Sequence, residues 1–306
     1  MADIGIIGSG NVGANTAFFL AERGVADTCL YDVKEGLAAG KALDMMEAAP
    51  IRGYVSRITG TDSFDDLRGC HTLIVAAGTV RTPGMKREDL LATNRGVIAE
   101  IAGKLRGSPA RVIMITEPVD ALTTFFVRES GLPWQRVMGL GGCLDSTRLR
   151  YLIATALGVS TENVDATVIG RHSDAMIPLG RYSTVSGVPV TLLLPEDRLD
   201  VLYRVTREAG GLIVDMAQRA SAYYGPSAVA ADVAEAIHRD SHRIIPVSLV
   251  FHGQYGIEGA AMSLPAVIGR AGIERVLEPR LTDSEIGALR ESAAVILRGL
   301  EREKVR

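Results

Sequence analysis

Three glycines near the start of the chain are spaced for binding a dinucleotide. Gly8, Gly10 and Gly13 form a G-x-G-x-x-G pattern directly after an apolar run and at the start of a helical stretch. Such glycines allow a tight turn, a close approach of the backbone to a pyrophosphate, and a close contact between helix and strand. The helix N-terminus then faces the anionic phosphates. Because glycine turns between strands and helices are common, the pattern alone is weak evidence.

Asp32 strengthens this interpretation. It follows the second apolar run, about 20 residues beyond the last glycine, which is the separation expected for a carboxylate that binds a ribose. Such a carboxylate accepts hydrogen bonds from the adenosine ribose hydroxyls and repels a 2′-phosphate. The residues therefore predict NAD, and not NADP, as the cofactor. The alternative is a structural turn beside a surface aspartate. The predicted cofactor residues of this region are Gly8, Gly10, Asn11, Val12, Gly13 and Asp32.

Three further segments contain groups that could act on a substrate. They read AAGTVRTPGMKREDL at 76–90, LDSTR at 144–148 and IGRHSDAMIPL at 169–179. Histidine transfers protons near neutral pH, and arginine binds carboxylates through two parallel hydrogen bonds. In their order and spacing these segments resemble the lactate/malate dehydrogenase superfamily, and the resemblance extends over nearly the whole chain.

The resemblance implies a role for each of four residues. His172 matches the catalytic histidine, which gives its proton to the substrate carbonyl oxygen while NADH delivers hydride to the carbon. Asp145 matches the carboxylate that orients the imidazole and stabilises its charged form. Arg148 matches the guanidinium that binds the C1 carboxylate of the substrate. Arg87 matches the arginine that polarises the reacting carbonyl.

The resemblance also implies the substrate. Arg81 stands at a loop position that is arginine in malate enzymes and glutamine in lactate enzymes, so reversible hydride transfer between malate or oxaloacetate and NAD is expected. A cation there would pair with the second carboxylate once the loop closes and expels water. Further residues that match cofactor-contacting positions are Asn94, Ile115, Thr116 and Glu117.

Three positions in two segments depart from the family pattern. The resemblance predicts an asparagine that contacts substrate where this chain has Glu117, and a glutamate and a glycine where it has Arg171 and Ser173. A carboxylate beside an anionic substrate is unfavourable unless it is protonated or paired. Arg171 is the candidate partner for an ion pair with Glu117, and a protonated Glu117 is the alternative. Glu117 leaves two alternatives open: a lactate or other 2-hydroxy acid dehydrogenase, and a catalytically weak NAD-binding module.

The first half of the chain alternates short β-branched runs with helical patterns, which predicts a Rossmann-type doubly wound parallel sheet over residues 1–142. Ligands of such a sheet bind beyond the carboxyl ends of its strands. The predicted strands are Ile4–Ile7, Thr28–Tyr31, Arg57–Gly60, Thr72–Ala77, Arg111–Ile115 and Arg136–Gly139. The predicted helices are Asn11–Arg23, Leu37–Ala48 (ending before Pro50), Glu88–Leu105 and Val119–Glu129.

After residue 142 the pattern predicts an α+β substrate/catalytic domain, residues 143–306. A chain of 306 residues exceeds the size at which one core usually keeps growing, so two domains are expected. Thr282 and Glu285 form a capping box that opens a last helix with the apolar face Ile286, Leu289, Ala293, Ile296 and Leu300. The other predicted elements are helices Ser146–Leu157, Asp197–Tyr224 and Ser227–Arg239, and strands Asp165–Ile169 and Ile244–Gly253.

Composition argues against several classes of partner. The net charge of −3 gives no reason to expect nucleic acid or a membrane surface, and no apolar run reaches the roughly 18 residues that span a bilayer. Three cysteines without a C-x-x-C pair fit reduced thiols in a cytoplasm. His238 and His242 lack an evident third ligand, so we expect no metal site. The resemblance implies a homodimer or homotetramer that takes a small dicarboxylate.

Overall fold

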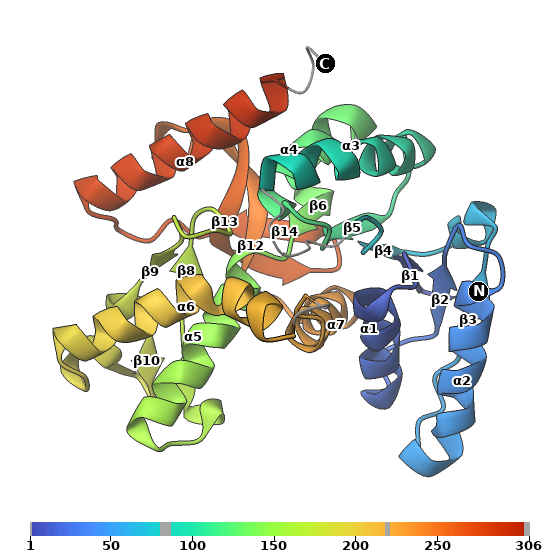
Figure 1. Cartoon of the computed structure of the whole chain (residues 1–306), viewed down its shortest axis with the longest axis horizontal. Helices are drawn as coiled ribbons and strands as arrows, with labels where there is room; N and C mark the ends of the chain where they lie inside the picture. Colours follow the sequence, from blue (N-terminus) through green and yellow to red (C-terminus); the bar gives the residue numbers. More distant parts are fainter. Residues whose placement is uncertain (1, 80–86, 218–220, 303–306) are drawn as a thin grey trace.

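The structure is a computed structural model that describes residues 2–79, 87–217 and 221–302, without the side chains of 87–89 and 217 (Figure 1). Six parallel strands form its first half: β1 (Ile4–Ile7), β2 (Thr28–Tyr31), β3 (Ile58–Thr61), β4 (Thr72–Val75), β5 (Arg111–Met114) and β6 (Val137–Gly139). Their order, β3-β2-β1-β4-β5-β6, reverses direction between β1 and β4. The predicted doubly wound sheet is therefore confirmed, and its ligand crevice lies at this switch point.

Helices cover both faces of the sheet. Figure 1 shows α1 (Asn11–Glu22), α2 (Leu37–Arg52) and α7 (Tyr224–His238) on one side, and α3 (Arg87–Lys104) and α4 (Val119–Ser130) on the other. Because both faces are covered, a central strand buries successive side chains, as the continuous apolar runs of the sequence indicate. All four residues of β1 are accordingly buried.

The second half of the chain extends the same sheet. β12 (Arg243–His252) pairs antiparallel with β6 through Ser248 and Gly139, and β13 (Glu258–Gly269) and β14 (Gly272–Val276) follow as antiparallel neighbours. The sequence predicted the first of these strands and missed the other two. The glycines and alanines of β13 have low β-propensity, so its pairing with β12 on one side and with β14 on the other explains why it forms a strand.

The remaining elements surround this sheet. Three helices complete the fold: α5 (Gly142–Leu157), α6 (Glu196–Ala217) and α8 (Asp283–Arg302). Two small sheets contain β7 (Val164–Asp165), β10 (Thr184–Val185) and β11 (Val188–Pro189) in one, and β8 (Val168–Ile169) and β9 (Ile177–Pro178) in the other. Short 3₁₀ turns lie at Phe64–Leu67, Trp134–Arg136, Thr161–Asn163, Gly180–Tyr182, Val190–Leu192 and Gln254–Gly256.

Two predicted helix boundaries are wrong for reasons connected with proline. α2 continues past Pro50 to Arg52, because a proline so close to the end disturbs only the last turn before Gly53, which adopts the left-handed conformation. α7 begins at Tyr224 instead of Ser227, and the helix predicted to reach Tyr224 is described as α6 only as far as Ala217. Pro226 therefore lies in the first turn of α7, where its missing N–H is not needed.

The capping box that opens α8 is present. The Thr282 backbone N–H donates to Glu285 Oε2 at 2.8 Å, and the Glu285 N–H donates to Thr282 Oγ1 at 3.3 Å. The helix buries four of the five residues of the predicted apolar face, Leu289, Ala293, Ile296 and Leu300, whereas Ile286 in its first turn is only half-buried.

The three cysteines are buried free thiols, and burial raises the pKa of Cys70 to about 12. Within the described ranges, no helix is long and apolar enough to cross a membrane.

Candidate active site

The loop between β1 and α1 has the geometry that its glycines permit. Gly8 has a φ of 102°, and a Cβ at Gly13 would collide with the Gly8 carbonyl oxygen. A Cβ at Gly10 would meet no protein atom within 4 Å, so the space over this residue is open. Asn11 and Val12 form the first turn of α1. The loop therefore presents the N-terminus of a helix to an open space.

Asp32 lies directly beyond β2 and next to this loop. Its Oδ2 accepts the Ser9 backbone N–H at 2.8 Å, and its Oδ1 accepts the Lys34 N–H at 3.1 Å. Lys41 on α2 donates to the Ser9 carbonyl oxygen at 2.7 Å. Sequence reasoning did not single out Lys41, because a lysine in a helix gives no sign of the loop that it contacts. The Ser9 hydroxyl is buried and has no hydrogen-bond partner among the described residues.

Asn94 of α3 joins the loops that follow β4 and β5. Its Oδ1 accepts the Thr79 backbone N–H, and its Nδ2 donates to the Glu117 carbonyl oxygen, each at 2.7 Å. The Asn94 side chain is fully buried. Thr116 adds a second connection, because its hydroxyl donates to the backbone of the loop after β4 at 2.7 Å. The structure therefore places Asn94 behind the two loops, where it holds them together.

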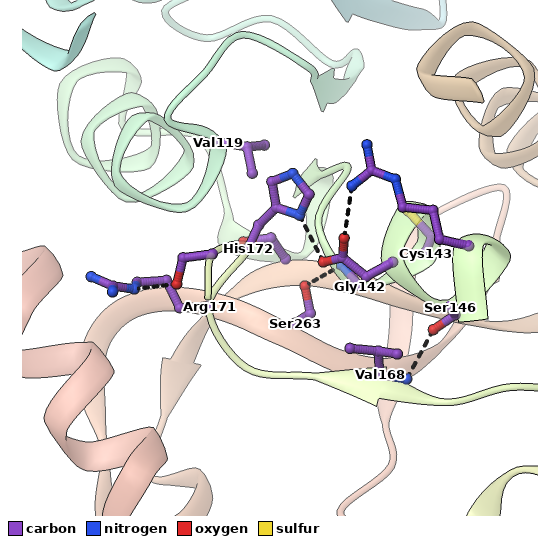
Figure 2. A network of polar contacts seen from close by, with 12 residues as sticks. Val119, Gly142, Cys143, Ser146, Val168, Arg171, His172 and Ser263 are labelled. Atoms are coloured by element: carbon purple, nitrogen blue, oxygen red, sulfur yellow. Dashed lines mark hydrogen bonds and ion pairs between the residues drawn. The ribbon is translucent and has the colours of Figure 1, made fainter. Parts of the chain in front are cut away.

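A histidine and an aspartate from different elements meet beside these loops. Asp145 lies in the first turn of α5 and is only 1 % exposed, and its Oδ2 is 2.7 Å from His172 Nδ1 (Figure 2). Arg148, one turn further along α5, donates to Asp145 Oδ1 at 3.2 Å. A carboxylate on Nδ1 keeps the proton on that nitrogen in the neutral ring and directs Nε2 toward the cavity.

Asp120 holds the backbone of the loop that contains this histidine. Its Oδ2 accepts the His172 backbone N–H at 2.6 Å, and its Oδ1 accepts the Ser248 hydroxyl of β12 at 2.5 Å. Burial raises the pKa of Asp120 to about 6, against the lowering effect of these hydrogen bonds. The one sign of this role in the sequence is an acidic residue at the start of an otherwise apolar helix.

Glu117 contacts the other nitrogen of the same imidazole. Its Oε1 lies 3.1 Å from His172 Nε2, and its Oε2 accepts the Val119 backbone N–H at 3.1 Å. Burial lowers the pKa of His172, but the charges of Asp145 and Glu117 outweigh it and hold that pKa well above its usual 6.5. The imidazole is therefore held between two carboxylates and favours its protonated form.

The predicted ion pair between Glu117 and Arg171 is wrong. Among the ion pairs of the described residues, Arg171 contacts Asp174 at 3.8 Å, and its Nε donates to Ser173 Oγ at 2.9 Å. Figure 2 shows the Arg171 side chain leaving the loop away from the His172 ring. Arg171 therefore contacts the residues that follow His172 in the same loop, and not the residues that line the site.

One cavity contacts both groups of residues. Its lining includes Val12 of the glycine-rich loop, Thr116 and Glu117 after β5, Arg148 of α5, and His172. Ile115 and Ala222 also line this cavity.

Two predicted substrate residues cannot be placed relative to this cavity. Arg81 lies outside the described residues, and for Arg87 only the backbone is described, at the start of α3.

The histidines considered for a metal site do not form a pair. His238 ends α7, whereas His242 Nε2 lies 3.1 Å from Glu274 Oε2 and 3.9 Å from Asp240 Oδ1. The ligand atoms of these last three residues lie within 4.8 Å of one another at the surface. The structure therefore groups His242 with two carboxylates instead of with His238.

Comparison with known proteins identifies the family. Residues 2–139 match the family described as "lactate/malate dehydrogenase, NAD binding domain", and residues 143–304 match "lactate/malate dehydrogenase, alpha/beta C-terminal domain". The chain belongs to the lactate/malate dehydrogenase family. It is 40 % identical over 293 residues to the malate dehydrogenase of Bacillus subtilis, covering 94 % of each chain.

Solved structures of this family share the fold over the full length. The malate dehydrogenase of Cryptosporidium parvum superposes with a TM-score of 0.95 at 33 % identity, covering 99 % of each chain. The lactate dehydrogenase of the same organism, solved with lactic acid and NAD, gives 0.93 at 34 % identity and covers 98 % of this chain and 97 % of its own. Lactate and malate enzymes therefore both resemble this chain, and overall fold does not separate them.

The residues of this family member fit NAD. The open space over Gly10, the unpartnered Ser9 hydroxyl and the carboxylate of Asp32 lie together at the ends of β1 and β2. An open backbone and a helix N-terminus suit a pyrophosphate, and the carboxylate suits the ribose hydroxyls.

Proposed function

We propose that this chain is an NAD-dependent malate dehydrogenase that interconverts malate and oxaloacetate. One observation supports this proposal above the others: the His172–Asp145 pair, Arg148 and the first turn of α1 line or adjoin a single cavity. An NAD-binding module alone has no need of a histidine paired with a buried aspartate. The homologues named malate dehydrogenase support the same activity.

In the reduction of oxaloacetate, the chain supplies the proton and binds the anionic groups. NADH, when bound, provides the hydride that adds to the carbonyl carbon. Protonated His172 then gives its Nε2 proton to the carbonyl oxygen, which forms the hydroxyl of malate. Asp145 stabilises the imidazolium from the Nδ1 side at 2.7 Å. Malate oxidation reverses these steps, with neutral His172 accepting the hydroxyl proton.

Three arginines are proposed to bind different groups of the substrate. Arg148 binds the C1 carboxylate by paired hydrogen bonds, Arg87 polarises the carbonyl, and Arg81 pairs with the second carboxylate. At the cofactor end, the Gly8–Gly13 loop binds the pyrophosphate and Asp32 binds the ribose. Ile115–Glu117 border the nicotinamide side, and Asn94 acts by holding their loop in place.

The roles of the two domains, the oligomeric state and the cellular location are proposals as well. We propose that residues 1–142 bind NAD and residues 143–306 bind the substrate, in a homodimer or homotetramer. The buried free thiols support a cytoplasmic location, and the net charge of −3 gives no reason to expect binding to membranes or nucleic acid. Interconversion of malate and oxaloacetate would make this an enzyme of the tricarboxylic acid cycle.

The deciding experiment compares oxaloacetate with pyruvate as substrate, each with NADH and NADPH, for the wild type and for Arg81→Gln. We expect oxaloacetate with NADH to be preferred. Loss of one partner of a buried charge pair costs roughly 3–5 kcal/mol, so Arg81→Gln should lower kcat/KM for oxaloacetate by about 10²-fold or more and spare pyruvate. A wild type that reduces pyruvate at least as well would support the lactate or other 2-hydroxy acid alternative. Turnover of neither substrate would support the NAD-binding module.

A further inference from the structure

His172 has a carboxylate at each ring nitrogen, and the two differ in burial. The Asp145 side chain is 1 % exposed, whereas the Glu117 side chain is 43 % exposed and faces the cavity. Glu117 is nevertheless held, because its second oxygen accepts the Val119 N–H in the first turn of α4. A helix N-terminus stabilises a negative charge. The contact at Nε2 therefore involves an anchored carboxylate that retains access to solvent.

We propose that Glu117 is an internal competitor of the substrate, because its carboxylate occupies the Nε2 position of His172 that the reacting oxygen must take. This inference rests on the proposed function, in which Nε2 delivers the proton. Glu117 acts through His172 and controls both substrate affinity and the pH range of reduction.

Geometry requires the displacement. A general acid must lie within about 2.6–3.2 Å of the atom that it protonates. Glu117 Oε1 already lies 3.1 Å from Nε2, and the protonated nitrogen carries a single hydrogen. Carboxylate and carbonyl oxygen cannot both accept that hydrogen in a linear bond. Since Asp145 is buried and bonded to Arg148, Glu117 is the partner that moves.

Several charged groups besides Glu117 lie around the same imidazole. Asp145 on α5 and Asp120 on α4 both form hydrogen bonds with His172. Arg148 on α5 and Arg207 on α6 line the cavity as cations, and Asp174, Glu208 and Asp215 line an adjoining cavity that His172 also borders. Arg171 points away. Arg81 and Arg87 have side chains outside the described residues. In this setting an ionised Glu117 favours the imidazolium by direct contact and disfavours an anionic substrate.

One interaction thus has two measurable effects. If the contact between Glu117 and the imidazolium must break before substrate binds, its free energy both raises the pKa of His172 in the free enzyme and weakens substrate binding. Each pKa unit that Glu117 contributes then corresponds to about a tenfold loss of affinity. An opposite charge at this distance shifts a pKa by about 1–3 units in buried sites, and the exposure of Glu117 places the effect at the low end.

The first test follows the imidazole of the free enzyme by NMR, using ¹⁵N-labelled histidine, with the His172 signals assigned by their loss in His172→Asn. Glu117→Gln keeps the shape of the side chain and removes its charge, so the pKa of His172 should fall by about one unit. Asp174→Asn is the matched control, because it removes an exposed charge two residues from His172 that contacts Arg171. In this control the pKa of His172 should stay within a few tenths of a unit of its wild-type value.

The second test measures oxaloacetate reduction against pH in the same variants. Glu117→Gln should lower the KM for oxaloacetate by about tenfold, and the upper pH limit of kcat/KM should fall with the pKa of His172. Glu117→Asn, which is shorter, serves as a second variant and should behave in the same way. An unchanged pKa of His172 in both variants, or a lower pKa without a lower KM, would overturn the proposal. If the wild type reduces no oxaloacetate but the pKa still falls, the proposed function fails separately and the contact stands.

Discussion

The cofactor end and the substrate end of the cavity are built in different ways. At the cofactor end, Gly8–Gly13 is one continuous segment that runs from a turn into the start of α1, and the Asp32 carboxylate is held by backbone N–H groups. At the substrate end, His172, Asp145 and Glu117 come from three separate elements and depend on one another for position and charge. A site made by one turn is determined locally, whereas a site made by side chains from distant segments depends on how the whole chain packs.

The two ends also differ in charge. The cofactor loop offers backbone N–H groups and a helix N-terminus to an anion, which requires no titration. The substrate end surrounds one imidazole with two carboxylates, so its chemistry depends on pH. Four changes test whether the two ends are as independent as this comparison indicates.

The largest effect is expected for His172→Asn. Loss of the general acid should lower kcat for oxaloacetate reduction by about 10²–10⁴-fold. Affinity for NADH, measured by fluorescence titration, should stay within about twofold, because the residue does not touch the glycine-rich loop. Near-normal turnover would remove the proposed role, and a parallel loss of NADH binding would show that the two ends are coupled.

In the wild type, activity in the reduction direction should persist above pH 6.5. It should decline as pH rises through the raised pKa of His172, because the imidazolium is the proton donor.

Asp120→Asn should change stability in a pH-dependent way. The carboxyl has a pKa of about 6 in the folded protein and 3.8 as its usual value, so ionising the buried group opposes folding. This penalty is absent below pH 3.8 and complete above about pH 6. The free energy of unfolding of the asparagine variant, relative to wild type, should therefore rise over this range by up to roughly 3 kcal/mol.

Denaturant titrations at several pH values measure this difference, with Asp174→Asn as the control for loss of an exposed carboxylate. The asparagine can still accept the His172 N–H and can donate to Ser248, so turnover near neutral pH should fall by less than about tenfold. A stability difference that does not depend on pH would contradict the assignment of the raised pKa to Asp120.

Asp32→Ser tests the cofactor end. Without the carboxylate, a 2′-phosphate is no longer repelled, so the preference for NADH over NADPH should narrow by about tenfold or more, while the pH profile of His172 stays unchanged. The ratio of kcat/KM for the two cofactors measures this. Equal use of both cofactors by the wild type would remove the basis of the assignment.

The smallest effect is expected for the coupling between Glu117 and Arg171. Since the two side chains do not pair, a double-mutant cycle of Glu117→Gln and Arg171→Gln should be additive within about 0.5 kcal/mol. The cycle is measured on kcat/KM for oxaloacetate. A larger coupling energy would support the ion pair between Glu117 and Arg171 that the sequence suggested.

The sequence predicted the cofactor end of the cavity better than the substrate end. The glycine-rich turn and Asp32 were predicted in place, because backbone conformation there follows from residue type. The covering of both sheet faces was predictable from continuous apolar runs such as Ile4–Ile7. β13 was missed because its register comes from β12, and α2 was ended too early because Pro50 sits in its last turn.

Side-chain direction was the part that the sequence could not supply. Glu117 and Arg171 have opposite charges, and both were expected near the active-site ends of their strands, which suggested a pair. The loop conformation instead turns His172 inward and Arg171 outward, and this depends on the Asp120 bond to the loop backbone. Asp120 was overlooked because its partners lie far along the chain, Ser248 being 128 residues away.

The pairing of β6 with β12 has a consequence for the growing polypeptide. While the chain leaves the ribosome, the six parallel strands can assemble, but β6 remains an open edge until β12 has been made. Open edges of apolar strands are sites of association between chains. Val137, Met138 and Gly139 are all buried in the finished fold, so nascent chains are exposed to aggregation at this strand during synthesis of the intervening segment. Slow translation of that segment would lengthen the period in which a chaperone has to cover it.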